Sequence, residues 1–314
     1  MTNIFAITFP IYAAIAIGYV LVKREWFAKD EMRTLGKYVL NLALPALIFN
    51  AVASRRISEV LHPDYILAYA LGGVAVAAAS YGLFSLRGTD PRRRALGVMG
   101  STCPNNGFIG YPIMLLTFPD LAGVILALNL LVENILLIPL CLLLMELADS
   151  NQQVSPLRKI FGILLNVLRM PMVIGLMLGL VVSLSGLQMP GPMTQLMTML
   201  AASASALSLV VIGGSLVGLP LHGNRGLAAQ ITATKLILHP AMVGLSVVAL
   251  TALGLINLGP ELRAAIILSA AMPMFGVYTV FAQKQGLEGA ASLAMLGATT
   301  CAFASLNILL FLLT

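Results

Sequence analysis

Ten stretches of mostly apolar residues, each about as long as a membrane-crossing helix, follow one another along this chain with short polar links between them. The hydrocarbon core of a bilayer is about 30 Å thick, so a helix needs roughly 20 apolar residues to cross it. We therefore predict an all-α integral membrane protein with ten transmembrane helices. Their predicted limits are 3–22, 36–53, 64–87, 95–118, 120–147, 160–185, 193–217, 227–255, 261–282 and 288–313.

Composition agrees with a membrane environment. Hydrophobic residues make up 59% of the chain and charged residues only 10%, and the mean hydropathy is +0.97. So little polar surface cannot cover a soluble globule. A net charge of +6 would suggest nucleic acid as the partner of a soluble protein, but here the basic residues stand in short links between apolar stretches. We therefore expect membrane lipid as a partner and no nucleic acid.

The distribution of Lys and Arg predicts an orientation. Counted over alternate links, thirteen basic residues fall on one side of the membrane and three on the other. Because cytoplasmic links carry the excess of Lys and Arg, both termini are predicted to lie outside the cytoplasm.

Two parts of the chain share a pattern at a fixed spacing. The matched pairs are Arg94 with Arg263, Ala95 with Ala264, Pro104 with Pro273 and Gly107 with Gly276, all 169 positions apart, and Pro10 with Pro171 and Gly18 with Gly179, 161 positions apart. Each half then holds five stretches, and an odd number of crossings inverts the second half relative to the first. We predict a five-helix repeat at 1–147, a cytoplasmic loop at 148–159 and an inverted second repeat at 160–314.

The paired prolines predict interrupted helices at matching places in the two halves. Proline lacks a backbone N–H, so it breaks a membrane helix, and the freed backbone groups must then face protein or a watery cavity. The half-helix after such a break presents N–H groups and the positive end of its dipole, which suits a carboxylate. Pro104 and Pro273, in the fourth and ninth stretches, are therefore candidate substrate-binding residues.

Side chains beside the breaks differ between the halves. Asn105 and Asn106 follow Pro104, and they either bind substrate or cap the half-helix. Met274 and Phe275 take the matching places in the ninth stretch, which suits an anion with an organic body. Tyr278, one turn further along, either offers its hydroxyl to substrate or packs between helices.

Further polar residues lie in other apolar stretches. Ser203 and Ser205 stand in a run of small residues, where they either line the site or allow close helix packing. Asn41 precedes Leu44-Pro45, and a bend there would bring it to the substrate pocket.

Three ionisable residues lie deep in apolar stretches, which marks them as candidates for coupling or proton relay. Glu133 shares a helix face with Asn129, and its alternative role is structural hydrogen bonding. Lys235 and His239 are four residues apart on one face of the eighth stretch. Lys235 alternatively extends to the membrane surface.

The chain resembles the auxin efflux carrier family, including its bacterial malonate and malate permease branch. The resemblance rests on Leu44-Pro45, on Pro104-Asn105-Asn106 ending in Gly110-Tyr111-Pro112, on the stretch from Thr234-Lys235 to Pro240, on Ser203 to Leu207 and on Gly286 to Leu296. It implies a scaffold domain and a transport domain that move relative to one another, with the fourth and ninth helices crossing. It also implies a small carboxylate as substrate, the bacterial cytoplasmic membrane as location, and a homodimer.

These observations predict a secondary transporter of small organic anions, such as malonate, malate or auxin-like acids. An anion channel that uses the same half-helix site is the alternative. No phosphate-binding loop, catalytic constellation or zinc-ligand spacing is visible in the sequence, so we expect no enzyme activity, no cofactor and no metal.

Overall fold

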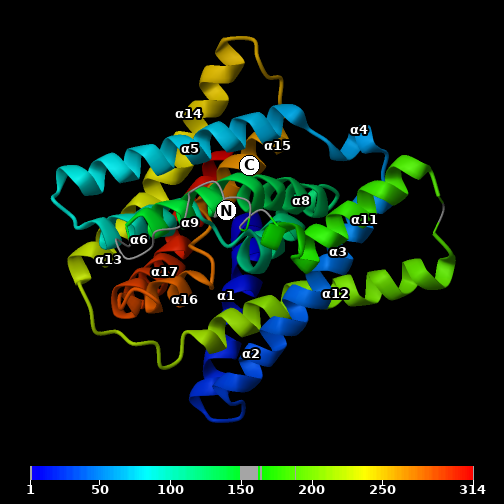
Figure 1. The fold of residues 1–314 in the computed structure, drawn as a ribbon. Coiled ribbons are helices and arrows are strands. Elements are labelled where there is room, and N and C mark those ends of the chain that lie inside the picture. The colour runs from blue at the N-terminus through cyan, green and yellow to red at the C-terminus, as the bar shows by residue number, and fades with distance from the viewer. Residues whose placement is uncertain (1, 149–161, 163–164, 188, 314) are drawn as a thin grey trace. The chain divides into compact units, whose positions relative to one another are not determined.

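The structure is a computed structural model that describes residues 2–148, 162, 165–187 and 189–313. Every regular element in these ranges is a helix (Figure 1). The all-helical class predicted from the sequence therefore holds for the described chain. The predicted loop at 148–159 lies outside the described residues except for Ala148, and so does the beginning of the predicted sixth helix.

Within the described chain, seven helical runs are long and apolar enough to cross a membrane: Phe5–Lys23, Lys29–Ala53, Ile57–Leu86, Ala122–Leu147, Gly191–Ser215, Arg225–Ala252 and Glu288–Leu313. They match seven of the ten predicted stretches. The sixth stretch corresponds to the shorter apolar helix Pro171–Ser185, and the fourth and ninth are interrupted. The total of ten helices and their inverted repeat remain predictions.

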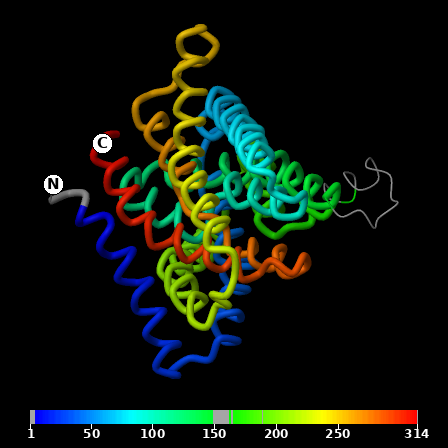
Figure 2. Tube along the Cα trace, turned by 90° about the vertical axis from the view of Figure 1, so that its left-hand side faces the viewer, coloured from blue at the N-terminus to red at the C-terminus, as the bar shows by residue number. Residues whose placement is uncertain are grey.

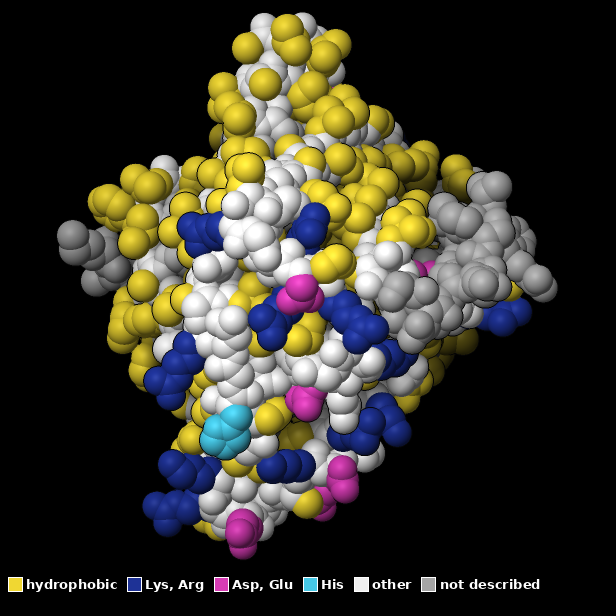
Figure 3. All heavy atoms as spheres, turned by 60° about the vertical axis from the view of Figure 1, so that its left-hand side comes forward, with side chains coloured by type: hydrophobic (Ala, Val, Ile, Leu, Met, Phe, Trp, Pro, Cys, Tyr) yellow, Lys and Arg dark blue, Asp and Glu magenta, His cyan; other side chains and the backbone are white. Residues whose placement is uncertain are grey.

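Exposed apolar side chains are abundant on these helices. Hydrophobic side chains form broad areas of the surface drawn in Figure 3. Leu184 is 68% exposed, Val248 65% and Phe311 62%, each on a different apolar helix. Continuous exposed apolar surface of this kind fits contact with lipid tails and not with water.

The chain forms two compact units, each built from segments that are distant in sequence. Unit 1 combines 1–63, 106–131 and 167–218, and unit 2 combines 64–105, 132–166 and 219–314. Each unit contains segments from both predicted repeats. The units therefore divide the chain differently from the repeats predicted at 1–147 and 160–314, and these repeats stay a prediction.

Unit 1 has a core between helices from its three segments. Its helices are α1 (Thr2–Lys23), α2 (Lys29–Tyr38), η1 (Val39–Ala43), α3 (Leu44–Ala53), α4 (Ile57–Val60), η2 (Asn106–Gly110), α7 (Tyr111–Thr117), most of α8 (Ala122–Val132), α11 (Pro171–Ser185) and α12 (Gly191–Ser215). α1 packs on α12 and α11 on α3. Glycine allows the first contact, because a Cβ on Gly213 would lie 1.8 Å from the Ile15 carbonyl oxygen.

Unit 2 contains both breaks, at Pro104 and Pro273. Its helices are α5 (Pro63–Leu86), α6 (Pro91–Thr102), η3 (Glu133–Leu137), α9 (Ile138–Leu147), α13 (Arg225–Ala233), η4 (Thr234–Leu238), α14 (His239–Ala252), α15 (Pro260–Ala271), α16 (Tyr278–Gln283) and α17 (Glu288–Leu313). α13 and α17 run side by side (Figure 2), and α6 packs on α9. This packing surrounds the two breaks with helices.

Each η segment of the described chain is a turn of π-helix, and each is followed by a proline at the second position of the next α-helix: Pro45, Pro112, Pro139 and Pro240. A proline inside a helix removes one donor. At η1, η3 and η4 the residue before proline donates instead to the carbonyl five residues earlier, as His239 does to Thr234. The helix continues with one extra residue in the turn, an arrangement that is frequent at functional sites.

Candidate functional site

The two breaks predicted at Pro104 and Pro273 are present, and in unit 2 they pair with each other. The Asn105 amide donates to the Pro273 carbonyl at 2.7 Å, and the Phe275 amide donates to the Cys103 carbonyl at 3.2 Å. Pro104 and Met274 thus form an antiparallel bridge outside any strand. Because hydrocarbon offers no partners to freed backbone groups, this mutual pairing allows two helices to be interrupted at one place.

The chain continues differently after the two breaks. After Asn105 it enters η2, which leads directly into α7. After Met274 it reaches α16, which has only six residues. The helical segment after the second break is therefore shorter than η2 and α7 together, and its dipole is correspondingly weaker.

Polarity also differs between the breaks, as the sequence suggested. Asn105 is buried in unit 2, with 5% of its surface exposed, and it has polar partners. Met274 is buried on the opposite side of the bridge, and Phe275 is half-buried. One arm of the bridge therefore carries an amide side chain, and the other carries apolar side chains.

Tyr278 lies fully buried at the beginning of α16. Its hydroxyl has no hydrogen-bond partner within the described residues, and neither has the buried hydroxyl of Thr102 on α6. A Cβ on Gly100 would lie 2.8 Å from the Tyr278 oxygen, so Gly100 makes room for this hydroxyl against α6. A buried unpaired hydroxyl costs free energy, which favours a polar role over simple packing.

Glu133 begins η3 and is buried, with 3% of its surface exposed. Its carboxylate accepts a hydrogen bond of 2.9 Å from the Tyr69 hydroxyl of α5. The carboxylate also acts electrostatically on Lys235. Sequence analysis missed Tyr69, because nothing in the sequence shows which of eight tyrosines approaches the buried acid.

Lys235 lies in η4 with none of its surface exposed. Its Nζ atom is 2.6 Å from His239 Nδ1 and donates to the Ala270 carbonyl at 3.0 Å. The alternative that Lys235 extends to the membrane surface is therefore wrong. The predicted position of Lys235 beside His239 is confirmed. Next to it, the hydroxyls of Ser101 and Thr234 lie 2.6 Å apart and link α6 to η4.

The remaining predicted site residues lie in unit 1. Asn106 begins η2 and is buried with polar partners. The Ser203 hydroxyl lies 3.1 Å from the Tyr38 hydroxyl, while the Ser205 carbonyl accepts from Ser208, whose hydroxyl also donates to the Phe108 carbonyl of η2. Asn41 is exposed and donates to the Lys37 carbonyl. Ser203 and Ser208 thus link α12 to α2 and η2 within unit 1, while the choice between packing and substrate binding for Ser203 and Ser205 stays a prediction.

The cysteines are free. Cys103 and Cys141 are buried in unit 2 with their sulfurs 3.8 Å apart. Cys301 is exposed on α17.

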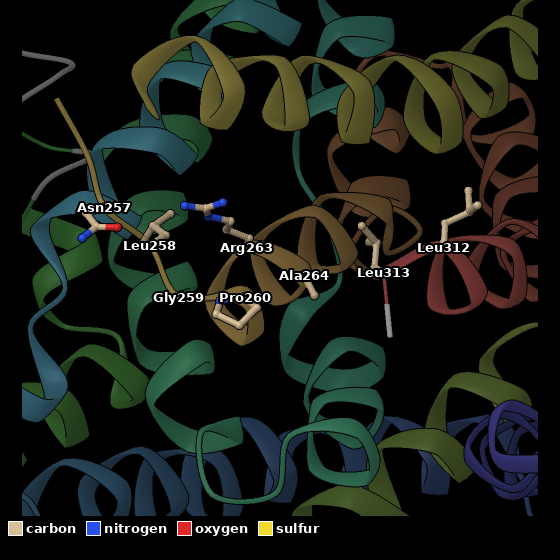
Figure 4. A pocket seen from close by; sticks show the side chains of 8 residues that line it. All are labelled: Asn257, Leu258, Gly259, Pro260, Arg263, Ala264, Leu312 and Leu313. Atoms are coloured by element: carbon tan, nitrogen blue, oxygen red, sulfur yellow. The ribbon is translucent and has the colours of Figure 1, made fainter. Parts of the chain in front are cut away.

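A cavity of about 510 Å³ lies at the beginning of α15 (Figure 4). It is lined by Asn257, Leu258, Gly259, Pro260, Arg263, Ala264, Leu312 and Leu313. The twelve residues of α15 place about three helical turns between its first residue and the break. This cavity is therefore separate from the bridge, and none of the predicted site residues lines it.

Among the described residues, seven apolar helices long enough to cross a membrane and two interrupted helices that pair through their backbones define a multi-pass helical membrane protein. A family model described as membrane transport protein matches residues 4–311, which is nearly the whole chain. The chain therefore belongs to this family, the auxin efflux carrier family, as the resemblance indicated.

Two named relatives are similar over most of their length. A protein of Rhizobium meliloti (strain 1021) named "Putative malonate transporter" is 27% identical over 249 residues, which cover 78% of this chain and 77% of the relative. A protein of Escherichia coli (strain K12) named "Uncharacterized transporter YfdV" is 24% identical over 236 residues, 74% of each chain. Membrane transport is thus the general function of this chain.

Proposed function

We propose that this protein is a secondary transporter of small organic anions, with malonate, malate and auxin-like acids as candidate substrates. The observation that carries the proposal is the backbone bridge between Pro104 and Met274. Interrupted helices that meet inside the membrane leave irregular backbone at a depth where it is tolerated only inside protein or beside a water-filled cavity. Such places are the usual substrate sites of transporters.

The side chains around the bridge support an anion with a carbon skeleton as the substrate. Asn105 supplies amide donors for a carboxylate, and the buried Tyr278 hydroxyl adds a donor without a partner of its own among the described residues. Met274 and Phe275 supply apolar contacts to the skeleton. The name of the Rhizobium relative favours malonate within this class.

Transport further requires that the site open to each side in turn. We place this change between the two compact units, because each has its own packed interior and the chain passes between them at 63–64, 105–106, 131–132, 166–167 and 218–219. The crossing at 105–106 directly follows Asn105. The bridge itself lies within unit 2, so it can stay intact during such a change.

Purified protein in liposomes tests this function. We expect saturable uptake of labelled malonate or malate, and faster uptake when the same acid is present inside. Asn105→Ala is expected to weaken uptake, whereas Asn307→Ala, which removes an amide bonded to a carbonyl of its own helix, serves as the matched control.

Absence of saturable uptake across a panel of carboxylates would contradict this proposal. Electrical recording separates the transporter from the channel alternative. A channel would pass large currents without exchange of internal for external substrate, whereas the proposed transporter shows exchange.

A further inference from the structure

Pro273 leaves the last turn of α15 short of donors. Because proline has no N–H, the Ser269 carbonyl four residues earlier loses its helical partner, and the donor for the Ala270 carbonyl would come from Met274, beyond the break. The Ser269 carbonyl accepts from the Met272 amide at 3.4 Å. The Ala270 carbonyl instead accepts from the Nζ atom of Lys235, a residue of another helix.

Lys235 and His239 together carry at most one positive charge. Two cations cannot lie 2.6 Å apart where neither is exposed to water, so at most one of the two groups is charged. An ammonium that donates to both the Ala270 carbonyl and His239 Nδ1 accounts for these two contacts and places the histidine hydrogen on Nε2, which has no partner within the described residues. The bonded charge then lies at the negative end of the α15 dipole.

The charged residues on the helices around η4 lie at the beginnings of those helices and do not occupy this position. The elements packed on η4 are α6, α13, α14, α15 and α17. Their titratable residues other than His239 are Arg92, Arg93 and Arg94 on α6, Arg225 on α13, Glu261 and Arg263 on α15, and Glu288 and Cys301 on α17. All but Cys301 lie within the first four residues of their helices, and Cys301 is exposed. The Glu133 carboxylate acts on Lys235 electrostatically, but the Lys235 Nζ atom bonds to Ala270 and His239.

In transporters with interrupted helices, the C-terminal ends of half-helices and unwound carbonyls commonly bind the coupling sodium ion or proton. We propose that the Lys235 ammonium is a covalently attached cation that occupies this kind of position at the end of α15. The inference deepens the proposed function, on which its transport consequence rests. Because the position is already filled, neither folding of unit 2 nor substrate transport requires sodium.

The test removes the ammonium and supplies a soluble one. Lys235→Ala opens a space beside the Ala270 carbonyl that methylammonium, with its three N–H donors, can enter. Tetramethylammonium carries the same charge without an N–H and serves as the ligand control. The measurement is the midpoint of thermal unfolding of the purified full-length protein in detergent, which does not depend on knowing the substrate.

We expect methylammonium to raise the midpoint of Lys235→Ala with increasing concentration and to leave the wild type unchanged, while tetramethylammonium affects neither. Lys235→Met keeps the side-chain length without the charge and is expected to lower malonate uptake about tenfold or more. Lys284→Met, at an exposed lysine of unit 2, should match the wild type. Replacement of sodium by choline should leave wild-type stability and uptake unchanged.

Several outcomes would overturn the inference: sodium-dependent stability or uptake of the wild type, Lys235→Met with wild-type uptake, or no response of a folded Lys235→Ala to methylammonium. If Lys235→Ala does not fold, the sodium dependence of the wild type and the uptake by Lys235→Met decide the question. Failure of the wild type to transport any carboxylate would reject the proposed function, while the thermal measurement would still test the attached cation.

Discussion

Both interrupted helices leave backbone groups without helical partners, but the side chains beside the two breaks differ in chemistry. Both stop two residues before a proline, and each supplies one carbonyl and one amide to the bridge. The first arm follows its proline with Asn105, whereas the second follows it with Met274 and Phe275 and has a lysine from η4 bonded to the end of its helix. The comparison suggests that the backbone builds the crossing and that the side chains divide substrate recognition from charge compensation.

The largest expected effect comes from repair of one break. Pro273→Ala restores an N–H that can donate to the Ser269 carbonyl, so α15 can extend and the bridge to Pro104 shifts. A displacement of about 1 Å at a binding site can cost a hundredfold, and we expect malonate uptake to fall by about that factor. Pro91→Ala, at the beginning of α6 and directly after its N-cap Asp90, is the control because this proline sits at a helix start. Equal losses in both variants would remove the special role of the bridge.

The next effect separates the polar arm from the apolar arm. Asn105→Ala removes amide donors without changing a helix, and we expect the half-saturation concentration for malonate to rise about tenfold. Uptake measured over a range of malonate concentrations gives this value, with Asn307→Ala as the control. An unchanged half-saturation concentration would mean that Asn105 only caps the break.

Phe275→Ala tests whether the apolar arm contacts the substrate skeleton. We expect a loss of about 1 kcal/mol, or roughly fivefold in affinity, for an aromatic acid such as indole acetate, and a smaller loss for malonate. Competition of each acid with labelled malonate measures the difference. Equal losses for the two acids would argue against contact between this ring and the skeleton.

The smallest effect concerns the attachment of η4 to the first arm. Ser101→Ala removes the hydroxyl 2.6 Å from Thr234, and we expect the free energy of unfolding to fall by about 1 kcal/mol. Ser80→Ala is the matched control, because the buried Ser80 hydroxyl bonds only within its own helix. Denaturation of both variants in detergent compares them, and an equal loss would show that the link between helices adds nothing.

The positions of the breaks were predictable because proline acts on its own helix. Pro104 and Pro273 remove local donors whatever surrounds them, and their shared spacing indicated that they belong together. The membrane class followed equally directly from apolar stretches long enough to cross a bilayer.

The partners of the buried ionisable groups were not predictable in the same way. Tyr69 lies 64 residues from Glu133, and Ala270 lies 35 residues from Lys235. Distance from a helix end suggested that Lys235 reaches the membrane surface, but its helix face is covered by α15 and not by lipid. Such contacts depend on the rotation of one helix against another, which an almost uniformly apolar sequence leaves undetermined.

A structure of the protein with bound malonate tests the central claim most directly. The account predicts density for the dicarboxylate beside Asn105 and Met274, at the bridge between the two breaks. Density in the cavity beside Arg263 instead, with the bridge unoccupied at saturating malonate, would contradict it.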